Sequence, residues 1–503
     1  MSKFAWETII WKDVQMRVSR YQQRIYNASI NNNRSKVRFL QKKLLSSLDA
    51  KLLAVFKVTT LNKGKKKIKI DDKNYQTSEQ KMHLVNTLNL DGTTLRIKKI
   101  WLPKSGQLEK RPLDIPIIKD RAKQALCLFA LEPEWEAKFE PNIYGFRPEC
   151  KCHDAIKVIL SNFENTYQNI NKATYILDVD LSKYFNSIDH NYLLKKLDTL
   201  PEIEKQICAW LQAGLIEGFN SIYDLKRSMV PANQIGISEG YIISPLIINI
   251  ILHGLATYLK RWIYSQSYPI RYVKKEDSTK QNTLTIVSYA YDFVVIHTEK
   301  ELLLAVKIEI EKLLASTSKL SFNEQNIKIV SAMQGFQFLG FQIIITKRNG
   351  ILRLKSYPST DSQKQLLNKV REIIQKNKQA SSFDLIKKLT PVILHWGNYF
   401  KYCECTKTFE KLQHLIFQKI RAWVFRRDKN NPRYIVKEKY FPSGNYYTFK
   451  NIKHYDNWVL VGQRKIGSQN IESNWLPKLS WIKSSKWIKV KGNKSIYDKQ
   501  DTY

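Results

Sequence analysis

The sequence predicts a multidomain α+β protein. Between about Leu95 and Phe341, short runs rich in Ile, Val, Tyr or Phe are separated by helical patterns, and the stretches on either side repeat apolar residues at helical spacing. Strands and helices mixed in this way indicate an α+β arrangement. The chain has 503 residues, 43% of them hydrophobic. It therefore exceeds the ~100–200 residues of one domain and can bury several cores.

The first part of the chain is predicted to be helical. Apolar residues recur at helical spacing from Trp11 to about Phe56, which predicts two helices joined by the polar stretch NASINNNRS. The following segment, KGKKKIKIDD at 63–72, is too polar to be core. Its lysines fit a solvated loop and a contact with backbone phosphates about equally well: Lys65, Lys66, Lys67 and Lys69.

The central and later segments alternate between strand and helix patterns. Strands are expected at Tyr175–Leu181, at Leu284–Ser288 with Phe293–His297, and at Phe338–Ile345. Helices are expected at Lys119–Phe139, His153–Asn165, His190–Leu197 and Ser244–Ile263. From about Ser359 to Arg427 the pattern is helical again.

The charge balance points to nucleic acid as a partner. Lys and Arg number 83 against 45 Asp and Glu, a net charge of +38, which is far more than solubility needs. The last 70 or so residues mix tryptophans with lysines, a composition that suits stacking of RNA bases and pairing with phosphates. For WIKSSKWIKVK (481–491), an amphipathic strand with a lysine-covered outer face is nearly as good an interpretation.

Other classes of protein are disfavoured. The six cysteines include two C-x-C pairs but lack histidines at zinc-finger spacing, so we expect reduced thiols and no zinc. No run of ~18 apolar residues occurs, so no membrane partner is expected. The acidic N-terminus without an apolar stretch is typical of the start of a domain rather than a targeting segment. Abundant Lys, Asn and Ile fit an AT-rich organellar gene.

Two stretches place carboxylates where a polymerase needs them. Template-directed polymerisation uses two divalent ions, and Mg²⁺ prefers oxygen ligands. In DVDLSKYFNSIDH (178–190), Asp178 and Asp180 share one face of a strand. The segment YAYD (289–292) lies between two β runs, where a hairpin tip would present Asp292 toward that strand.

Further motifs accompany these carboxylates in a fixed order: RPLDIPIIKDRAKQAL (111–126), YGFRP (144–148), DLSKYFNSIDH (180–190), GISEGYIISPLIINIILHGL (236–255), SYAYDFVVI (288–296) and GFQFLGF (335–341). The series resembles the fingers and palm motifs of group II intron reverse transcriptases. LTPVILHWGNYF (389–400) resembles their maturase-specific thumb, domain X. The resemblance implies a right-hand polymerase with a helical N-terminal extension (1–94), fingers and palm (95–345), a helical thumb or domain X (346–435) and a basic aromatic tail (436–503).

The resemblance also implies roles for single residues. Asp180 and Asp292 would be palm carboxylates that hold Mg²⁺. Phe185 would screen the sugar 2′ position, Lys119 and Arg121 would face the triphosphate, and Gly236, Gly240 and Ser244 would lie under the template and incoming base. Three arginines around Trp423 are candidates for phosphate contacts, with a solvated helical face as the alternative: Arg421, Arg426 and Arg427.

Departures from the family pattern decide the expected function. The family hairpin reads Tyr-Ala-Asp-Asp, and Tyr291 replaces its first aspartate with a phenol whose ordinary pKa is ~10. Ser238-Glu239-Gly240 replaces Pro-Gln-Gly, and Asn326-Ile327 replaces a Lys-Thr pair. No cysteine follows Cys405, so the zinc-dependent endonuclease of many family members is not expected. Compensation by Asp292 or Asp178 is the alternative to a weakened metal site.

These observations predict a group II intron maturase that binds intron RNA and promotes its folding and splicing, with reverse-transcriptase activity lost and Mg²⁺ binding weakened. The alternative is an active RNA-directed DNA polymerase that serves intron mobility. No endonuclease target DNA is expected as a partner, and formation of a homodimer is left open. An organelle is the expected location, the chloroplast stroma ahead of the mitochondrial matrix.

Overall fold

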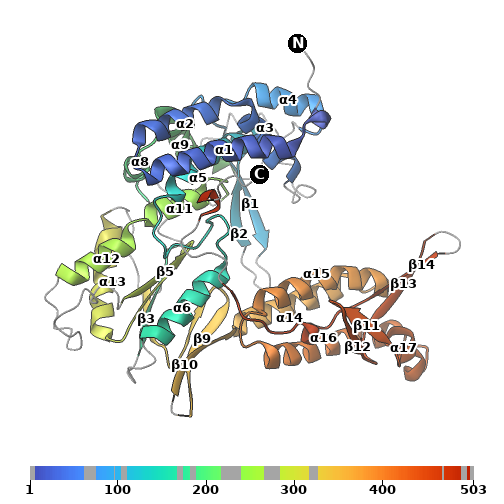
Figure 1. Ribbon diagram of the computed structural model, residues 1–503. Helices are drawn as coiled ribbons and strands as arrows, with labels where there is room; N and C mark the ends of the chain where they lie inside the picture. The colour runs from blue at the N-terminus through green and yellow to red at the C-terminus, as the bar shows by residue number, and fades with distance from the viewer. Residues whose placement is uncertain are drawn as a thin grey trace.

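The computed structural model describes residues 6–61, 75–95, 97–103, 110–166, 174–181, 188–213, 215–216, 240–265, 284–316, 327–349, 351–466, 470–488 and 495–498. The architecture is α+β, as predicted: N-terminal helices cover a mixed centre, and an elongated helical part extends to one side (Figure 1). Within the described residues, no helix is both long and apolar enough to cross a bilayer.

The N-terminal part contains three helices over the span where two were predicted: α1 (Trp11–Ile30), α2 (Arg34–Ser46) and α3 (Leu48–Phe56). The predicted loop NASINNNRS is wrong for its first residues, because α1 continues to Ile30. Ser29 is buried and its hydroxyl donates to the carbonyl of Glu134 at 3.0 Å, so tertiary packing outweighs the low helix propensity of this stretch. Asn33 then caps α2 by accepting a hydrogen bond from the Lys36 amide.

These helices pack on the long helix α5 (Ile118–Glu136), which confirms the helix predicted there. A buried network joins them: Arg38 and Gln41 of α2 both bond Oε2 of Glu134 at 2.7 Å. Because the buried carboxylate is fully paired, its desolvation is offset. Shorter elements complete this end: η1 (Trp6–Thr8), η2 (Lys57–Leu61) and α4 (Ser78–Asn86).

A small sheet lies beside α5. Strands β1 (Ile97–Pro103) and β2 (Lys110–Ile115) form an antiparallel hairpin, and β4 (Leu215–Ile216) pairs in parallel with β1. Helices α8 (His190–Leu197) and α9 (Pro201–Leu211) contact one another and lie close to α2 (Figure 1). The bounds of α8 match the predicted helix.

The central sheet has the order β5-β6-β3-β7 and is antiparallel between all neighbours. Its strands are β5 (Thr285–Tyr289), β6 (Asp292–His297), β3 (Tyr175–Asp180) and β7 (Ile327–Ser331). Leu177, Val179 and Phe293 belong to a core shared with α13 (Lys300–Ala315) and the N-terminal helices. Ile176 and Val294 belong to a second core shared with α6 (Cys152–Thr166) and the helical part beyond the sheet. The sheet therefore separates the two main cores.

Two predicted elements are interrupted. The helix expected over Ser244–Ile263 is split into α11 (Ser244–Leu252) and α12 (Leu255–Ser265) at Gly254, whose φ is +89°. The strand expected over Phe338–Ile345 is split into β8 (Phe336–Phe338) and β9 (Phe341–Arg348) by a turn in which Gly340 has φ +80°. Glycine tolerates this left-handed backbone, and the break follows from it.

The helical part beyond the central sheet follows the prediction. It contains α14 (Thr360–Lys376), α15 (Ser382–Phe400) and α16 (Thr406–Arg427), and then α17 (Arg433–Tyr440). The hairpin of β9 and β10 (Ile351–Pro358) connects it to the sheet, so the expected domain limit at residue 345 falls within a strand. Two further hairpins follow α17: β11 (Tyr446–Phe449) with β12 (Ile452–Tyr455), and β13 (Val461–Ile466) with β14 (Asn470–Trp475).

The C-terminal tail returns across the molecule. After η5 (Leu479–Trp481), residues 482–488 form no strand, so the amphipathic strand considered for this segment is wrong. Trp487 instead donates to Asp154 of α6 at 2.8 Å and stacks on His153. In η6 (Ile496–Asp498), Tyr497 donates to Glu132 of α5 at 3.0 Å, which brings the chain end to the N-terminal helices (Figure 1).

The buried His297 at the end of β6 predicts an acid-sensitive contribution to stability. Burial lowers the pKa of His297 to about 4, and its Nδ1 accepts the Glu299 amide at 3.0 Å. The unfolded chain, with a pKa of about 6.5, binds the proton first, so stability falls as pH drops from 6.5 toward 4. Replacing His297 with Asn removes this pH-dependent contribution to stability. The gap in unfolding free energy between wild type and His297→Asn should narrow by about 2 kcal/mol from pH 7 to pH 5 in urea titrations. A gap that does not change with pH would contradict this.

Candidate active site in the central sheet

The paired strands β3 and β6 bring the predicted carboxylates together. Asp180 is the last residue of β3 and lies directly opposite Asp292, the first residue of β6. Paired residues of antiparallel strands point to the same face, and Asp178 lies two residues away on that face. The hairpin tip predicted for residues 289–292 and the shared face of Asp178 and Asp180 are therefore confirmed.

The hairpin tip is held in a strained conformation by the YGFRP segment. Ala290, in the turn between β5 and β6, has φ +56°, which is unusual for a residue with a side chain. Tyr144 donates its amide to the carbonyl of Ser288, and Ser288 donates back to Asn142, both at 2.9 Å. A Cβ on Gly145 would lie 2.1 Å from the backbone nitrogen of Ala290. The glycine is required because the two backbones touch.

Two carboxylates of this cluster, Asp178 and Asp292, have raised pKa values. Burial, then the charges of Asp292 and Asp180, raise the pKa of Asp178 to about 6. Burial and then the Asp180 charge raise the pKa of Asp292 to about 6. Lys328, opposite Asp178 in β7, opposes the shift of Asp178. The site is thus a cluster of negative charge that a cation would relieve.

The same residues fit a two-ion magnesium centre only in part. Asp180 and Asp292 offer the oxygen ligands that Mg²⁺ prefers. Among the described residues, however, no three His, Cys, Asp or Glu side chains are grouped so that they could hold a metal ion.

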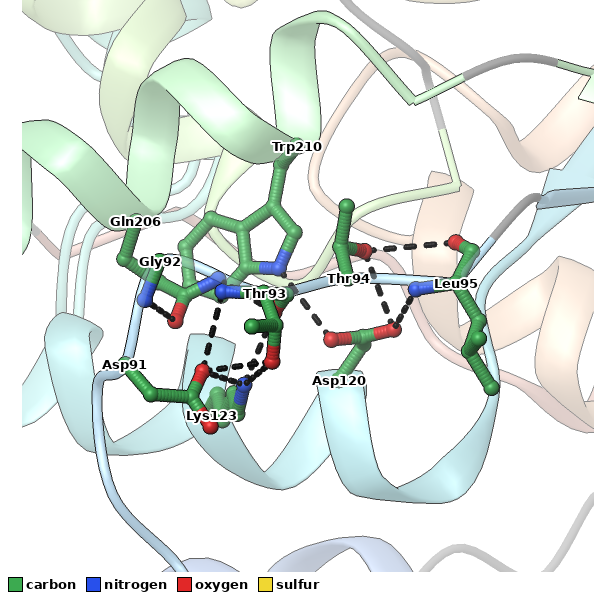
Figure 2. Close-up of polar contacts among 9 residues, drawn as sticks. All are labelled: Asp91, Gly92, Thr93, Thr94, Leu95, Asp120, Lys123, Gln206 and Trp210. Carbon is green, nitrogen blue, oxygen red and sulfur yellow. Dashed lines mark hydrogen bonds and ion pairs between the residues drawn. The ribbon is translucent and has the colours of Figure 1, made fainter.

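Helix α5 presents the predicted triphosphate-facing residues. Lys119 and Arg121 are half-buried in its first turns, and Asp120 between them is buried (Figure 2). Asp120 accepts from the Leu95 amide at 3.2 Å, the Thr94 hydroxyl at 3.0 Å and the Trp210 indole at 3.4 Å. Burial raises the pKa of Asp120 despite these donors.

An ion pair completes this cluster. The ammonium of Lys123, 1% exposed, bonds Oδ1 of Asp91 at 2.6 Å and the Thr93 carbonyl at 2.8 Å (Figure 2). Burial would raise the pKa of Asp91, but the bonds from Lys123 and Thr93 outweigh it and lower that pKa below its ordinary range. Gln206 of α9 bonds Gly92 and Thr93 as well. The segment that leads into β1 is therefore fixed to both helices.

The loop before α11 adjoins the same helix. Gly240 precedes Tyr241, whose hydroxyl donates to the Trp210 carbonyl at 2.6 Å, and Ile242 donates to Gln124 of α5 at 2.8 Å. Ser244 is buried as the first residue of α11. Phe185 and Gly236 lie outside the described residues, as do Lys65, Lys66, Lys67 and Lys69.

Comparisons with known protein families match three domains, in the order that the sequence motifs predict. Residues 6–88 match the N-terminal domain of reverse transcriptase, 102–343 match reverse transcriptase (RNA-dependent DNA polymerase), and 363–441 match the group II intron, maturase-specific domain. Protein YkfC of Escherichia coli K12 is 30% identical over 286 residues, which cover 52% of this chain and 70% of that protein. The chain belongs to the group II intron maturase and reverse transcriptase family.

The alignments with two further relatives cover different shares of those proteins. Maturase-like protein 1 of Euglena gracilis is 28% identical over 411 residues, 79% of this chain and 78% of that protein. Group II intron-encoded protein LtrA of Lactococcus lactis subsp. cremoris is 24% identical over 333 residues, 56% of this chain and 53% of that protein. The fold is accordingly that of reverse-transcriptase fingers and palm, joined to a maturase-specific helical part.

Residue 291, where the resemblance predicts an aspartate, is a tyrosine that follows Ala290 in the turn between β5 and β6. Tyr291 packs partly buried against the core that lies on the face of the sheet opposite Asp178, and its carbonyl accepts the Leu181 amide at 2.9 Å. The residue thus serves the packing of the hairpin and brings no carboxylate to the cluster. Asn326 is outside the described residues. Lys328, two residues further along the chain, lies in β7 opposite Asp178 and therefore on the carboxylate face.

The three arginines of this maturase-family chain lie on α16, away from the palm (Figure 1). All are exposed. Arg427 also donates to the carbonyls of Lys378 and Ala380, beyond the end of α14, so part of its hydrogen-bonding capacity is used within the protein. Arg421 and Arg426 present the more accessible charges.

Sequence reasoning missed the cluster around Asp120 and Lys123 and the contacts of the tail. Lys123 lies about one turn into the predicted helix, and no periodic pattern in the sequence distinguishes a buried lysine there from an exposed one. The contact between Trp487 and Asp154 joins residues 333 positions apart, which no local pattern indicates.

Gly145 offers a direct test of how the hairpin tip is held. Gly145→Ala should lower the free energy of unfolding by about 1–3 kcal/mol, because the added methyl group overlaps the Ala290 backbone. Gly444→Ala is a suitable control, since its φ is +76° but nothing lies within 4 Å of the new Cβ. Urea unfolding of both variants measures the difference. Gly444→Ala reports the cost of backbone strain without a contact, whereas Gly145 has no positive φ, so a Gly145→Ala variant as stable as wild type would contradict the close contact.

Proposed function

We propose that the chain binds group II intron RNA and promotes its folding and splicing, and that its reverse-transcriptase activity is lost or strongly impaired. The observation that carries the proposal is Tyr291 at the hairpin tip, the position at which the family pattern has the aspartate that acts with Asp180. The net charge of +38 and the exposed arginines of α16 support the RNA-binding part.

On this proposal the RNA supplies the catalysis and the protein stabilises its folded form. Mg²⁺ binds weakly at Asp180 and Asp292, and no zinc takes part. The gene is organellar, plastid ahead of mitochondrial, as the abundance of Lys, Asn and Ile in the chain favours. An active polymerase that serves intron mobility is the competing function, favoured by the intact pair of Asp180 and Asp292.

Residue 291 separates these two functions. Wild-type protein should give no processive primer extension on an RNA template with Mg²⁺ or Mn²⁺. Tyr291→Asp should bind Mn²⁺ on the order of 10-fold more tightly, since it adds one negative charge next to Asp292, while Tyr291→Asn, equal in size but neutral, should not. Electron paramagnetic resonance of free Mn²⁺ measures the affinity. Processive synthesis by wild type would overturn the claim of lost activity.

The RNA-binding part predicts a salt-dependent role for α16. Crosslinking in the native cells, followed by sequencing, should recover intron RNA. The double variant Arg421→Gln/Arg426→Gln should bind that transcript more weakly. The slope of log affinity against log salt concentration should become less steep by roughly 2, about one for each lost phosphate contact.

Arg17 provides the control for this pair of arginines. It is bonded to both carboxylate oxygens of Asp49 at 2.8 Å, so Arg17→Gln should leave the salt dependence nearly unchanged. Recovery of no intron RNA, or equal slopes in all proteins, would count against the splicing role or against α16 as its contact.

A further inference from the structure

The hairpin of β11 and β12 carries two exposed aromatic rings on its outer face. Tyr446 and Tyr455 are directly paired across the strands, 68% and 59% exposed, with ring centroids 5.2 Å apart. The next residues along each strand point the other way, and Tyr447 is 5% exposed. Large aromatic rings left open to solvent as a contiguous pair are unusual in a structure with ample core to bury them.

The hairpin is held rigidly from its inner face. The ring of His454 stacks on Trp481 at 4.4 Å and 12°, and Tyr447 packs beside Trp475. The turn residues Lys450 and Asn451 both have positive φ, as a two-residue turn of type I′ requires. Lys450 also donates to Asn398 of α15 at 3.2 Å. The outer rings are therefore presented in a fixed position, which reduces the entropy lost on binding.

The outer face is also cationic. Lys453 lies on it opposite Thr448, two residues along from the tyrosine pair, a spacing of roughly 7 Å along the strands. Lys453 is exposed and makes no ion pair with a described residue. The neighbouring carboxylate of Asp456 is neutralised by Lys478 at 2.5 Å. A ring pair followed by a free ammonium group matches an unpaired nucleotide, whose base stacks while its phosphate meets a positive charge.

We propose that the outer face of the β11–β12 hairpin binds unpaired nucleotides of RNA, with a base on Tyr446 and Tyr455 and the adjoining phosphate at Lys453. The hairpin lies outside residues 363–441, which match the maturase-specific domain. This inference rests on the proposed function in that it takes RNA as the partner. It adds a second contact surface, distinct from the arginines of α16.

The test uses the full chain and a 12-nucleotide oligouridylate as the probe. Tyr446→Ala/Tyr455→Ala should weaken binding roughly 10-fold, the loss of stacking for about one base. Tyr446→Phe/Tyr455→Phe keeps both rings and should bind as wild type does. Tyr258→Ala is the matched control, since Tyr258 is 39% exposed but donates to Glu309 at 2.5 Å, an acidic setting. Lys453→Gln should make the slope of log affinity against log salt concentration less steep by roughly 0.7, the value for one phosphate contact with a single strand.

The outcomes separate this inference from the proposed function. If wild type retains crosslinked intron RNA but the alanine pair binds the oligouridylate as wild type does, the hairpin site is overturned and the proposed function stands. If wild type binds neither RNA, both fail. If the alanine pair leaves RNA affinity unchanged but abolishes self-association in sedimentation, the rings form a protein contact and the hairpin site is overturned. Thermal unfolding of each variant, expected to match wild type because both rings are exposed, checks the fold.

Discussion

The antiparallel pairing of β3 with β6 is the constraint on which the rest of the molecule depends. Its register sets Asp180 opposite Asp292 and sends Leu177 and Val179 to one face of the sheet and Ile176 to the other. A slip of one residue would exchange the two faces and bury the carboxylates. Both hydrophobic cores therefore act to preserve the geometry of the acidic cluster, whether or not that cluster still serves catalysis.

This geometry explains how the palm can carry a tyrosine at residue 291 and keep its shape. The tip that carries Tyr291 is fixed by backbone contacts with the YGFRP segment, and those contacts do not depend on which side chain follows Ala290. The cluster around Asp120 and Lys123 likewise fixes the start of β1 through bonds among buried groups (Figure 2). Such buried networks are costly to break because each partner would be left unpaired.

The tail connects the parts of this scaffold. After its two hairpins, the tail contacts α6 through Trp487. It then contacts α5 and α1 through Tyr497, whose ring centroid lies 5.5 Å from that of Tyr26. Its aromatic rings are consequently used inside the protein to a greater extent than their composition indicated, while its lysines at 483 and 486 stay exposed. Within the described part of the tail, the most exposed aromatic rings are Tyr446 and Tyr455 of the β11–β12 hairpin.

The sequence by itself determined the α+β class, most helices and strands of the centre, and the carboxylate strand with its hairpin, because each rests on local periodicity or on ordered motifs. It also determined the substitution at residue 291. Only the tertiary structure decided where α1 ends, how the segments at Gly254 and Gly340 break, and that Lys123 and Trp487 are held inside the protein. These features depend on partners far away in the chain: Ser29 meets Glu134, and Trp487 meets Asp154. Local propensity is worth less than about 1 kcal/mol per residue, so such contacts override it wherever packing demands.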